Sequence, residues 1–484
     1  MNFIEDVIQG FPFAKLAVVA IDREGKRRDW HFSELFAMSA GLSGAMLARG
    51  VRRGDVVMTL VGSRIEWVLT LLACFRMGAV VMPCNPQLRA GDLKLRVEAA
   101  DPVLCVGDSE LMEQLPPGLE RMDLEDLARI FDEDLPQSMP ARAEELDPDD
   151  PAVIIFTSGT TGEPRGVVYP QRYLAGQELQ ARQWFGAEEG ELAWCTAAPG
   201  WSKSTRNCFI APWLCGAAAL IHDGRFDPEE RLEIIEREGV NVLCQAPTEY
   251  RIMARRNLLR PVKSLRRLVS AGEPMNPEVI GSFREEMGLG IADGYGQTES
   301  GAVTARLVGD DDPSKDGSMG HALPGIETRV ADDGELQVRR STVPSFALGY
   351  LNDDPFTEEW WNTGDHVRLD QDGFMWFEGR DDDIISSAGY RIGPFEVESA
   401  LLQHGAVAEA AAVAAPDPER GSVVKAFVVL RSGEPGPELA EELQEHAKAV
   451  TAPYKYPRQI EFVDSLPKTS SGKIRRSELR QREQ

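Results

Sequence analysis

Strand-like and helix-like segments alternate along the first part of the chain. The expected strands are apolar and rich in β-branched residues, whereas the expected helices repeat apolar residues every three or four positions. The strands are expected at 56–61, 79–82 and 103–106, and the helices at 65–77 and 88–99. A strand, a helix and a second strand in this order form a parallel sheet flanked by helices. The pattern therefore predicts an α/β fold.

The same pattern returns farther along the chain. Strands are expected near 218–221, 242–246 and 267–270, inside a region that runs from residue 193 to 296. With 484 residues the chain exceeds the roughly 250 to 300 residues that one hydrophobic core organises. We therefore predict a large N-terminal domain that contains two βαβ-type subdomains.

The C-terminal part of the chain has a different pattern. After residue 317, short apolar runs separated by glycines predict a small β-barrel-like layer of strands and turns. The final segment mixes both kinds of element and is predicted to form a small α+β domain. Its expected helices cover 395–403 and 439–450, and its expected strands cover 408–414 and 425–430.

The charge of the chain argues against two classes of partner. Its net charge of -26 and isoelectric point of about 4.8 disfavour non-specific binding to nucleic acid or to an anionic membrane, because both need clustered lysine and arginine. The longest apolar region, 67–84, is interrupted by Arg76 and Gly78, so no membrane span is predicted. Since the N-terminus lacks the features of a signal peptide, a cytoplasmic protein is predicted.

The seven cysteines are predicted to be reduced core residues. Their number is odd, they lie mostly in apolar runs, and no pair has the CxxC spacing. Free cysteine behaves as a small buried hydrophobic residue. Roles as metal ligands or nucleophiles are the alternative that this pattern disfavours.

A loop dense in hydroxyl groups and glycine lies between the apolar runs 152–156 and 167–169. Its glycines let backbone N–H groups converge on an anion, and its hydroxyl groups add further donors. The Walker pattern does not fit, because that motif leads into a helix and this loop leads into a strand-like segment. A flexible surface turn is the alternative for such a loop on its own. The candidate phosphate-binding residues are Thr157, Ser158, Gly159, Thr160, Thr161, Gly162 and Arg165.

Four further segments follow the loop in a fixed order. They are Ser270-Ala271-Gly272-Glu273-Pro274, Asp293-Gly294-Tyr295-Gly296-Gln297-Thr298-Glu299, Thr363-Gly364-Asp365 with Gly379-Arg380-Asp381-Asp382, and Pro467-Lys468-Thr469-Ser470-Ser471-Gly472-Lys473. Together with the loop they resemble the motif set of the adenylate-forming enzymes, which include acyl-CoA synthetases, luciferases and peptide-synthetase adenylation domains. The segments 200–204, 246–248 and 388–398 are most similar to those of medium-chain acyl-CoA synthetases.

The resemblance implies a two-step reaction with ATP, Mg²⁺ and CoA. A carboxylate is a poor electrophile. A bond between one of its oxygens and the phosphorus of AMP turns that oxygen into part of a leaving group. The transition state spreads negative charge over phosphate oxygens, so cations and preorganised donors stabilise it. The resemblance assigns the adenylation cation to Lys473, the α-phosphate donor to Thr298 and the magnesium ligand to Glu299.

The remaining nucleotide-site residues are also assigned by the resemblance. Tyr295 is expected to stack on the adenine, and Asp365 with Arg380 is expected to bind the ribose hydroxyl groups. The family usually has lysine at the position of Arg165, which keeps the charge and changes the geometry. The implied nucleotide-binding residues are Gly272, Glu273, Pro274, Asp293, Gly294, Tyr295, Gly296, Gln297, Asp365, Arg380 and Arg391.

The resemblance also places the boundary between the two domains. It implies an N-terminal domain over 1–381 and a mobile C-terminal domain over 382–484, which turns about Asp382 between the two half-reactions. Gly389 and Tyr390 are expected to bind CoA. The acyl pocket is expected to include Gly296, which leaves it open, and Trp201 as a wall; a core position beneath the pocket is the alternative for Trp201. The full set of acyl-pocket candidates is Trp201, Gln245, Ala246, Thr248 and Gly296.

The leading hypothesis is an ATP-dependent acid–CoA ligase for medium-chain, branched short-chain or small aromatic acids. Two alternatives stay open. The first is a ligase that loads the acyl group onto a carrier protein, and the second is a nucleotide-binding regulator without catalysis. The sequence does not decide the exact acid, or whether the chain forms a homo-oligomer.

Overall fold

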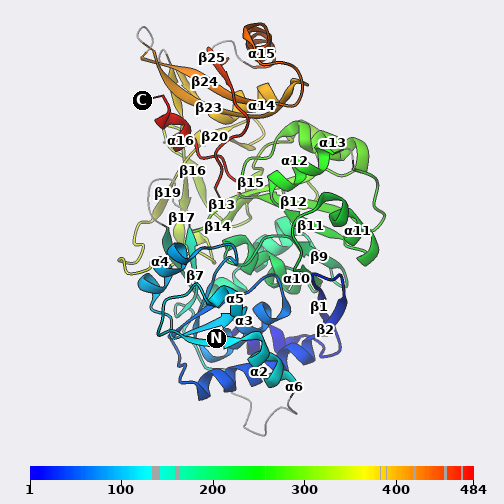
Figure 1. Cartoon of the computed structure of the whole chain (residues 1–484), viewed down its shortest axis with the longest axis vertical. Helices are drawn as coiled ribbons and strands as arrows, with labels where there is room; N and C mark the ends of the chain where they lie inside the picture. Colours follow the sequence, from blue (N-terminus) through cyan, green and yellow to red (C-terminus); the bar gives the residue numbers. More distant parts are fainter. Residues whose placement is uncertain are drawn as a thin grey trace.

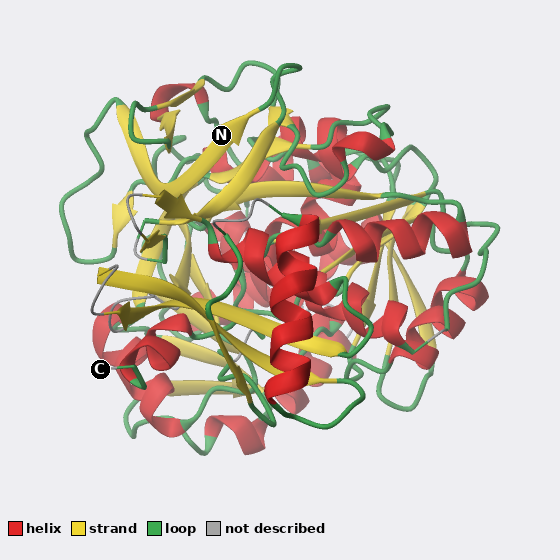
Figure 2. Cartoon of the chain, turned by 90° about the horizontal axis from the view of Figure 1, so that it is seen from above, coloured by secondary structure: helices red, strands yellow, loops and turns green. Residues whose placement is uncertain are grey.

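The computed structural model describes residues 1–132, 142–157, 164–256, 258–381, 383–387, 390–417, 421–451, 455–469 and 472–483. The chain up to the end of β20 (Met375–Arg380) forms a large body, and the C-terminal residues form a smaller body at one end of it (Figure 1). Seen from above, the C-terminal strands and helices lie over the larger body (Figure 2).

The first sheet contains the alternating elements with which the sequence begins. Strand β3 pairs in parallel with both β4 and β5, as predicted, and the antiparallel pair β7 and β8 extends the sheet past β4. The strands, in sheet order, are β18 (Gly349–Tyr350), β8 (Arg165–Pro170), β7 (Pro151–Thr157), β4 (Val80–Pro83), β3 (Val56–Leu60), β5 (Leu104–Gly107) and β6 (Glu120–Asp123).

The second sheet joins segments that are far apart in the sequence. Its parallel centre is the predicted region 193–296, but the hairpin of β1 and β2 adds to it because β1 pairs in parallel with β10. Periodicity did not indicate this addition. The strands, in sheet order, are β15 (His321–Ala322), β14 (Gly301–Ala305), β13 (Ile291–Gln297), β12 (Arg267–Ala271), β11 (Val242–Gln245), β9 (Leu192–Cys195), β10 (Ala218–His222), β1 (Leu16–Ile21) and β2 (Arg27–His31).

The helices of the large body follow sequence signals at their ends. In α11, Asp227 caps the N-terminus by accepting hydrogen bonds from the N–H groups of Glu229 and Glu230, and Gly239 ends the helix with a φ of 72°. The longer helices are α2 (Phe32–Ala48), α3 (Ile65–Met77), α4 (Ala90–Ala100), α6 (Leu124–Asp132), α11 (Pro228–Glu238), α12 (Pro247–Arg255) and α13 (Pro277–Met287).

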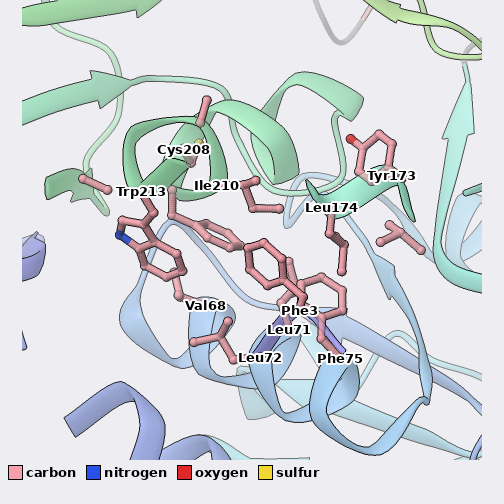
Figure 3. Packing of buried hydrophobic residues seen from close by; sticks show 14 of the residues in the cluster. Phe3, Val68, Leu71, Leu72, Phe75, Tyr173, Leu174, Cys208, Ile210 and Trp213 are labelled. Carbon is pink, nitrogen blue, oxygen red and sulfur yellow. The ribbon is translucent and has the colours of Figure 1, made fainter. Parts of the chain in front are cut away.

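A continuous helical segment lies between the two sheets. It consists of α9 (Ser202–Thr205), the π-helical turn η3 (Arg206–Ile210) and α10 (Ala211–Leu214). Side chains of this segment, Ile210 and Trp213 among them, lie against those of α3 (Figure 3). The rings of Trp67 and Phe209 are 5.5 Å apart. The two sheets therefore share one core. All seven cysteines are buried and none forms a disulfide, which confirms that they are core residues.

The last part of the chain forms a small antiparallel sheet and then a C-terminal unit of strands and helices, as predicted. The antiparallel sheet of the large body contains β16 (Thr328–Val330), β17 (Glu335–Arg339), β19 (Trp360–Leu369) and β20 (Met375–Arg380). The C-terminal unit contains β21 (Ile385–Ser387), β22 (Tyr390–Ile392), α14 (Pro394–Leu402), β23 (Val407–Asp417), β24 (Gly421–Leu430), α15 (Pro437–Val450), β25 (Gln459–Phe462) and α16 (Arg476–Gln481). The α/β fold class and the α+β character of the C-terminal unit are confirmed.

Candidate active site

Three of the predicted segments meet at one edge of the second sheet. Strands β11, β12 and β13 are parallel neighbours, so their carboxyl ends lie side by side. The segments that follow them begin at Ala246, Gly272 and Thr298. In open α/β sheets the crevice at the carboxyl ends of the strands is the usual ligand site. Segments separated by tens of residues in the sequence are thus brought together by the strand order.

The predicted ribose pair is in contact in the structure. Asp365 and Arg380 face each other on β19 and β20, with Arg380 Nη1 3.3 Å from Asp365 Oδ1. The Tyr295 hydroxyl donates to Asp365 Oδ2 at 2.5 Å, and Gln297 Nε2 donates to the same oxygen at 2.8 Å. Desolvation raises the pKa of Asp365, and the Arg380 charge opposes that shift. Tyr295 therefore orients Asp365, a contact that the sequence analysis did not foresee.

Lys473 lies beside this cluster although it belongs to the C-terminal unit. Its loop is closed by two hydrogen bonds, from Thr469 N to Lys473 O at 2.8 Å and from Lys473 N to Thr469 Oγ1 at 3.1 Å. A Cβ built on Gly472 would lie 3.6 Å from Thr248 Oγ1 of the large body. Lys473 keeps an exposed surface, yet desolvation by the protein around it lowers its pKa, and the Glu273 carboxylate opposes that shift.

Glu273 and Thr248 are tied to each other by Arg251. Arg251 Nη2 donates to Glu273 Oε2 at 2.6 Å and to Thr248 Oγ1 at 2.7 Å, and the Thr248 hydroxyl donates to Glu273 Oε2 at 3.2 Å. The network links α12 to the segment after β12. Thr248, an acyl-pocket candidate, therefore belongs to the support of the predicted adenine segment.

Glu299 is held by the segment that contains β18. Tyr350 donates its hydroxyl to Glu299 Oε1 at 2.8 Å, and Ala347 N donates to the backbone oxygen of Glu299 at 2.9 Å. The second carboxylate oxygen of Glu299 accepts no hydrogen bond from any described residue. A carboxylate with one free oxygen fits a Mg²⁺ ligand, and the remaining ligands would be phosphate oxygens and water.

Arg165 lies next to this support. Its guanidinium group is 3.5 Å from the centre of the Tyr350 ring, and it forms an ion pair with Asp353. A planar guanidinium group stacks on an aromatic ring and pairs with a carboxylate at the same time, which a lysine ammonium does less well. The departure from the usual lysine therefore has a structural use at the end of the phosphate loop.

Several predicted site residues lie where the structure gives no description of their side chains. The loop residues Ser158, Gly159, Thr160, Thr161 and Gly162, the hinge residue Asp382 and the CoA candidate Gly389 lie outside the described residues. Tyr390 and Arg391 lie in β22, and only their backbone is described. The functions assigned to these residues stay predictions.

The acyl-pocket candidates differ in how much they can offer a ligand. Gln245 is fully buried, accepts a hydrogen bond from Arg231 at 3.0 Å and has its amide nitrogen 3.2 Å from the Met253 sulfur. Its side chain therefore has no polar atom directed to a pocket. Trp201 is only partly buried and is absent from the core clusters, which disfavours the core alternative for this residue.

Gly296 is required by the backbone in this structure. A Cβ at this position would lie 1.8 Å from the carbonyl oxygen of Gly301, where β13 and β14 approach each other at an irregular register. Close approach of the two strands is therefore a further reason for glycine here, and the place of Gly296 in the acyl pocket stays a prediction. The side-chain direction at this position points to the neighbouring backbone, so close strand approach explains the glycine.

Lys203 lies in the segment 200–204 and contacts the site, although no role was predicted for it. Its ammonium group donates to the carbonyl oxygen of Ala271 at 3.0 Å, at the end of β12. It is also one of the neighbouring charges that lower the pKa of Lys473, after desolvation. The sequence signal for this role was the position of Lys203 in the segment 200–204. A lysine directly before an apolar helix seldom points inward, so one in this segment indicates a functional contact.

Comparison with known proteins identifies the family. The AMP-binding enzyme family matches residues 4–350, and the AMP-binding enzyme C-terminal domain matches residues 396–473. The chain therefore belongs to the AMP-binding enzymes. Within them it is an AMP-forming acyl-CoA synthetase, an ATP-dependent acid–CoA ligase, which confirms the family and the enzyme class predicted from the motifs.

Two relatives and one solved structure illustrate the similarity. The uncharacterized acyl-CoA ligase YtcI of Bacillus subtilis (strain 168) is 40% identical over 501 residues, covering 97% of this chain and 93% of the relative. The mitochondrial acyl-coenzyme A synthetase ACSM4 of Homo sapiens is 37% identical, covering 100% and 90%. The anthranilate CoA ligase AuaEII in complex with anthranoyl-AMP has a TM-score of 0.88 at 26% identity, covering 100% and 97%.

The described part of the chain contains neither a membrane-spanning helix nor a ready-made metal site. Over the part of the chain that the structure describes, no helix has the length and apolar character of a membrane span. Over the same residues, no group of three or more His, Cys, Asp or Glu side chains is placed to hold a metal ion. A magnesium ion at Glu299 would thus depend on the nucleotide for most of its ligands.

Proposed function

We propose that the protein adenylates a carboxylic acid with ATP at the cluster around Asp365, Arg380 and Lys473, and then transfers the acyl group to CoA. The observation that supports this proposal most directly is the placement of Lys473. Although it lies at the end of the chain, it stands among charged groups of the large body. A cation there pairs with both the substrate carboxylate and the α-phosphate.

In the first step, a carboxylate oxygen of the acid attacks the α-phosphorus of ATP and pyrophosphate leaves. Asp365 accepts hydrogen bonds from the ribose hydroxyl groups and is kept in position by Tyr295 and Gln297. Lys473 neutralises the charge that develops between carboxylate and phosphate. Mg²⁺, when bound at Glu299, supplies charge neutralisation for the phosphate oxygens. The donor assigned to Thr298 would bind the α-phosphate.

In the second step, the thiolate of CoA attacks the acyl carbon and AMP leaves. This step needs an open path to the acyl carbon, which Lys473 and its loop occupy in the arrangement described above. The proposed rotation about Asp382 would withdraw the loop and bring Gly389 and Tyr390 to the site instead. Each half-reaction thus has its own arrangement of the C-terminal domain.

The acid is proposed to be of medium length, short and branched, or a small aromatic acid. The resemblance of segments 200–204 and 246–248 supports the first two classes. The third is supported by two structural relatives that carry aromatic acids in their names, an anthranilate CoA ligase and a benzoate CoA ligase from Burkholderia xenovorans LB400, each 26% identical. The cytoplasmic location stays a prediction.

Two assays test the proposed function and its alternatives. Acid-dependent exchange of pyrophosphate into ATP, measured over a panel from acetate to dodecanoate with branched and aromatic acids, separates a catalyst from a nucleotide-binding regulator. CoA-dependent release of AMP then separates a CoA ligase from a ligase that loads a carrier protein. The absence of exchange with every acid would reject the proposal, and exchange without CoA-dependent AMP release would favour the carrier alternative.

Trp201→Ala is expected to shift the best substrate toward longer acids. Removal of the indole would lengthen the pocket, and each additional buried methylene group contributes roughly 0.8 kcal/mol. Because Trp201 is only partly buried, a small change in thermal stability should accompany the shift. The measurement is kcat/KM over the acid series beside the melting temperature. An unchanged chain-length profile with a large drop in melting temperature would contradict the pocket assignment.

The pH dependence of adenylation is expected to depend on Lys203. Lys473 has to be protonated to act, and its lowered pKa means that exchange activity falls at a lower pH than the pKa of free lysine, about 10.4. Lys203→Met removes a neighbouring positive charge, so the pKa of Lys473 rises and the alkaline limb moves to higher pH. Lys448→Met, at a half-buried lysine paired with Glu445 in the C-terminal unit, is the control. A limb that stays in place in Lys203→Met would refute the coupling.

A further inference from the structure

Arg206 is a buried arginine for which the described residues supply no partner. It is 6% exposed, at the first position of η3. Its Nε and Nη1 atoms are buried and make no hydrogen bond, and its side chain forms no ion pair with any described residue. Burial of a charge without a partner is strongly unfavourable, and buried arginines are almost always paired. A partner from outside the chain would remove this penalty.

Other buried polar atoms near Arg206 share this property. Thr205 Oγ1 and Asn207 Nδ2, on either side of it in the sequence, have no hydrogen-bond partner in the described structure. The same holds for Gln180 Oε1, whose amide nitrogen donates to Asn207 Oδ1 at 3.1 Å. Native interiors leave few such groups unsatisfied unless water or a ligand meets them. Several such groups within one short helical segment and its neighbour Gln180 mark a part of the core whose polar atoms the described residues leave unsatisfied.

The helical segment connects Arg206 to a residue beside the reacting groups. Lys203 and Arg206 are three residues apart on one continuous helix, so their side chains share a face, with roughly 5 to 6 Å between Cβ atoms. Lys203 reaches the end of β12 beside Lys473. Arg206 Nη1 lies 3.4 Å from where a Cβ on Gly301 would stand, two residues after Glu299. The widened π-helical turn begins at Arg206, and such turns are frequent at functional sites.

We propose that Arg206 binds a second carboxylate at the distal end of the acid substrate. This inference rests on the function proposed above and narrows its acid class to acids with a distal acceptor. A guanidinium group binds a carboxylate through two parallel hydrogen bonds, which gives direction as well as charge compensation. The reacting carboxylate would lie at Lys473, beside Lys203. Arg206 is one helical turn away from Lys203, and this separation suits the two carboxylates of a short or aromatic diacid.

The test compares matched pairs of acids that differ only in the distal group. The pairs are butanoate with butanedioate, pentanoate with pentanedioate, and benzoate with benzene-1,3-dicarboxylate. The measured quantity is kcat/KM for pyrophosphate release, expressed as the ratio of diacid to monoacid. The wild-type ratio is expected to exceed one for at least one pair. A site built around a polar substrate group discriminates strongly against the analogue that lacks it, so Arg206→Met should lower that ratio by roughly 100-fold or more.

Two further variants make the result specific. Arg206→Lys keeps the charge without the two parallel donors and should give an intermediate ratio. Arg182→Met, at an exposed arginine paired with Glu178, should leave the ratio as in the wild type. If Arg206→Met does not fold, as judged by its melting curve, the wild-type ratios and those of Arg206→Lys decide the question.

The outcomes distinguish this inference from the proposed function. If neither the acids of these pairs nor any acid of the panel from acetate to dodecanoate supports pyrophosphate release, the proposed function itself fails. If monoacids react and every diacid is the poorer member of its pair in the wild type, the inference is overturned while the proposed function stands. A ratio that Arg206→Met leaves unchanged would also overturn it, since Arg206 would then be satisfied by water alone.

Discussion

Lys473→Ala is expected to suppress pyrophosphate exchange by roughly 100- to 1,000-fold, as does the loss of one preorganised donor in other active sites. Thioester formation from pre-made acyl-adenylate should stay close to the wild-type rate. The lysine stands among Glu273, Asp365 and Arg380, where it acts on the carboxylate and phosphate of the first step. Its loop belongs to the C-terminal unit, and the proposed rotation would remove it before the second step.

Single-turnover assays of each half-reaction provide the measurement. Lys468→Ala is the matched control, because Lys468 lies in the same loop and forms an ion pair with Glu409 of its own domain. That variant should keep both half-reactions. Equal loss of both half-reactions in Lys473→Ala would reject the assignment of this lysine to the first step.

Asp382→Pro is expected to keep pyrophosphate exchange and to lower acyl-CoA formation by at least about tenfold. A hinge absorbs a large change of backbone angles at one or two residues, and proline restricts φ at the position where it stands. Asp383, the next residue, forms ion pairs with Arg476 and Arg480 near the end of the chain, so the chain is anchored to the C-terminal unit directly after the proposed hinge.

Asp382→Ala is the control, since alanine removes the carboxylate without restricting φ. It should support both half-reactions, and the comparison of the two variants separates backbone freedom from side-chain chemistry. Exchange and CoA-dependent AMP release are measured on the same preparations. A proline variant with wild-type thioester output would place the hinge elsewhere.

Local periodicity was enough to predict the individual elements. The strands expected at 56–61, 79–82 and 103–106 correspond to β3, β4 and β5. These predictions succeeded because alternation of apolar residues and helix-ending glycines such as Gly78 act over a few neighbouring positions. The membership of β1 and β2 in the second sheet was not predictable in the same way, because pairing with β10 depends on residues about two hundred positions away.

The candidate site also has a part that the sequence predicted and a part that it did not. The resemblance to the adenylate-forming enzymes assigned roles to Asp365, Arg380, Glu299 and Lys473, and the structure brings the first two into contact. The resemblance did not predict the supports of these residues. Tyr350 and Glu299 are 51 residues apart, and Lys203 and Ala271 are 68 residues apart. Contacts between residues so far apart leave no pattern in the local sequence, so the sequence could not predict them.

The sequence by itself determined the α/β class and the family, because each of these is written in short segments, and it predicted roles for the motif residues. Only the tertiary structure decided which residues support the motif residues. It showed that a side chain at Gly296 would meet the backbone of Gly301, and that the Gln245 side chain accepts a hydrogen bond from Arg231. It also revealed that Arg206 is buried without a hydrogen-bond or ion-pair partner among the residues that the structure describes. Burial and close approach are properties of the packed chain, so they appear only when distant segments share one core.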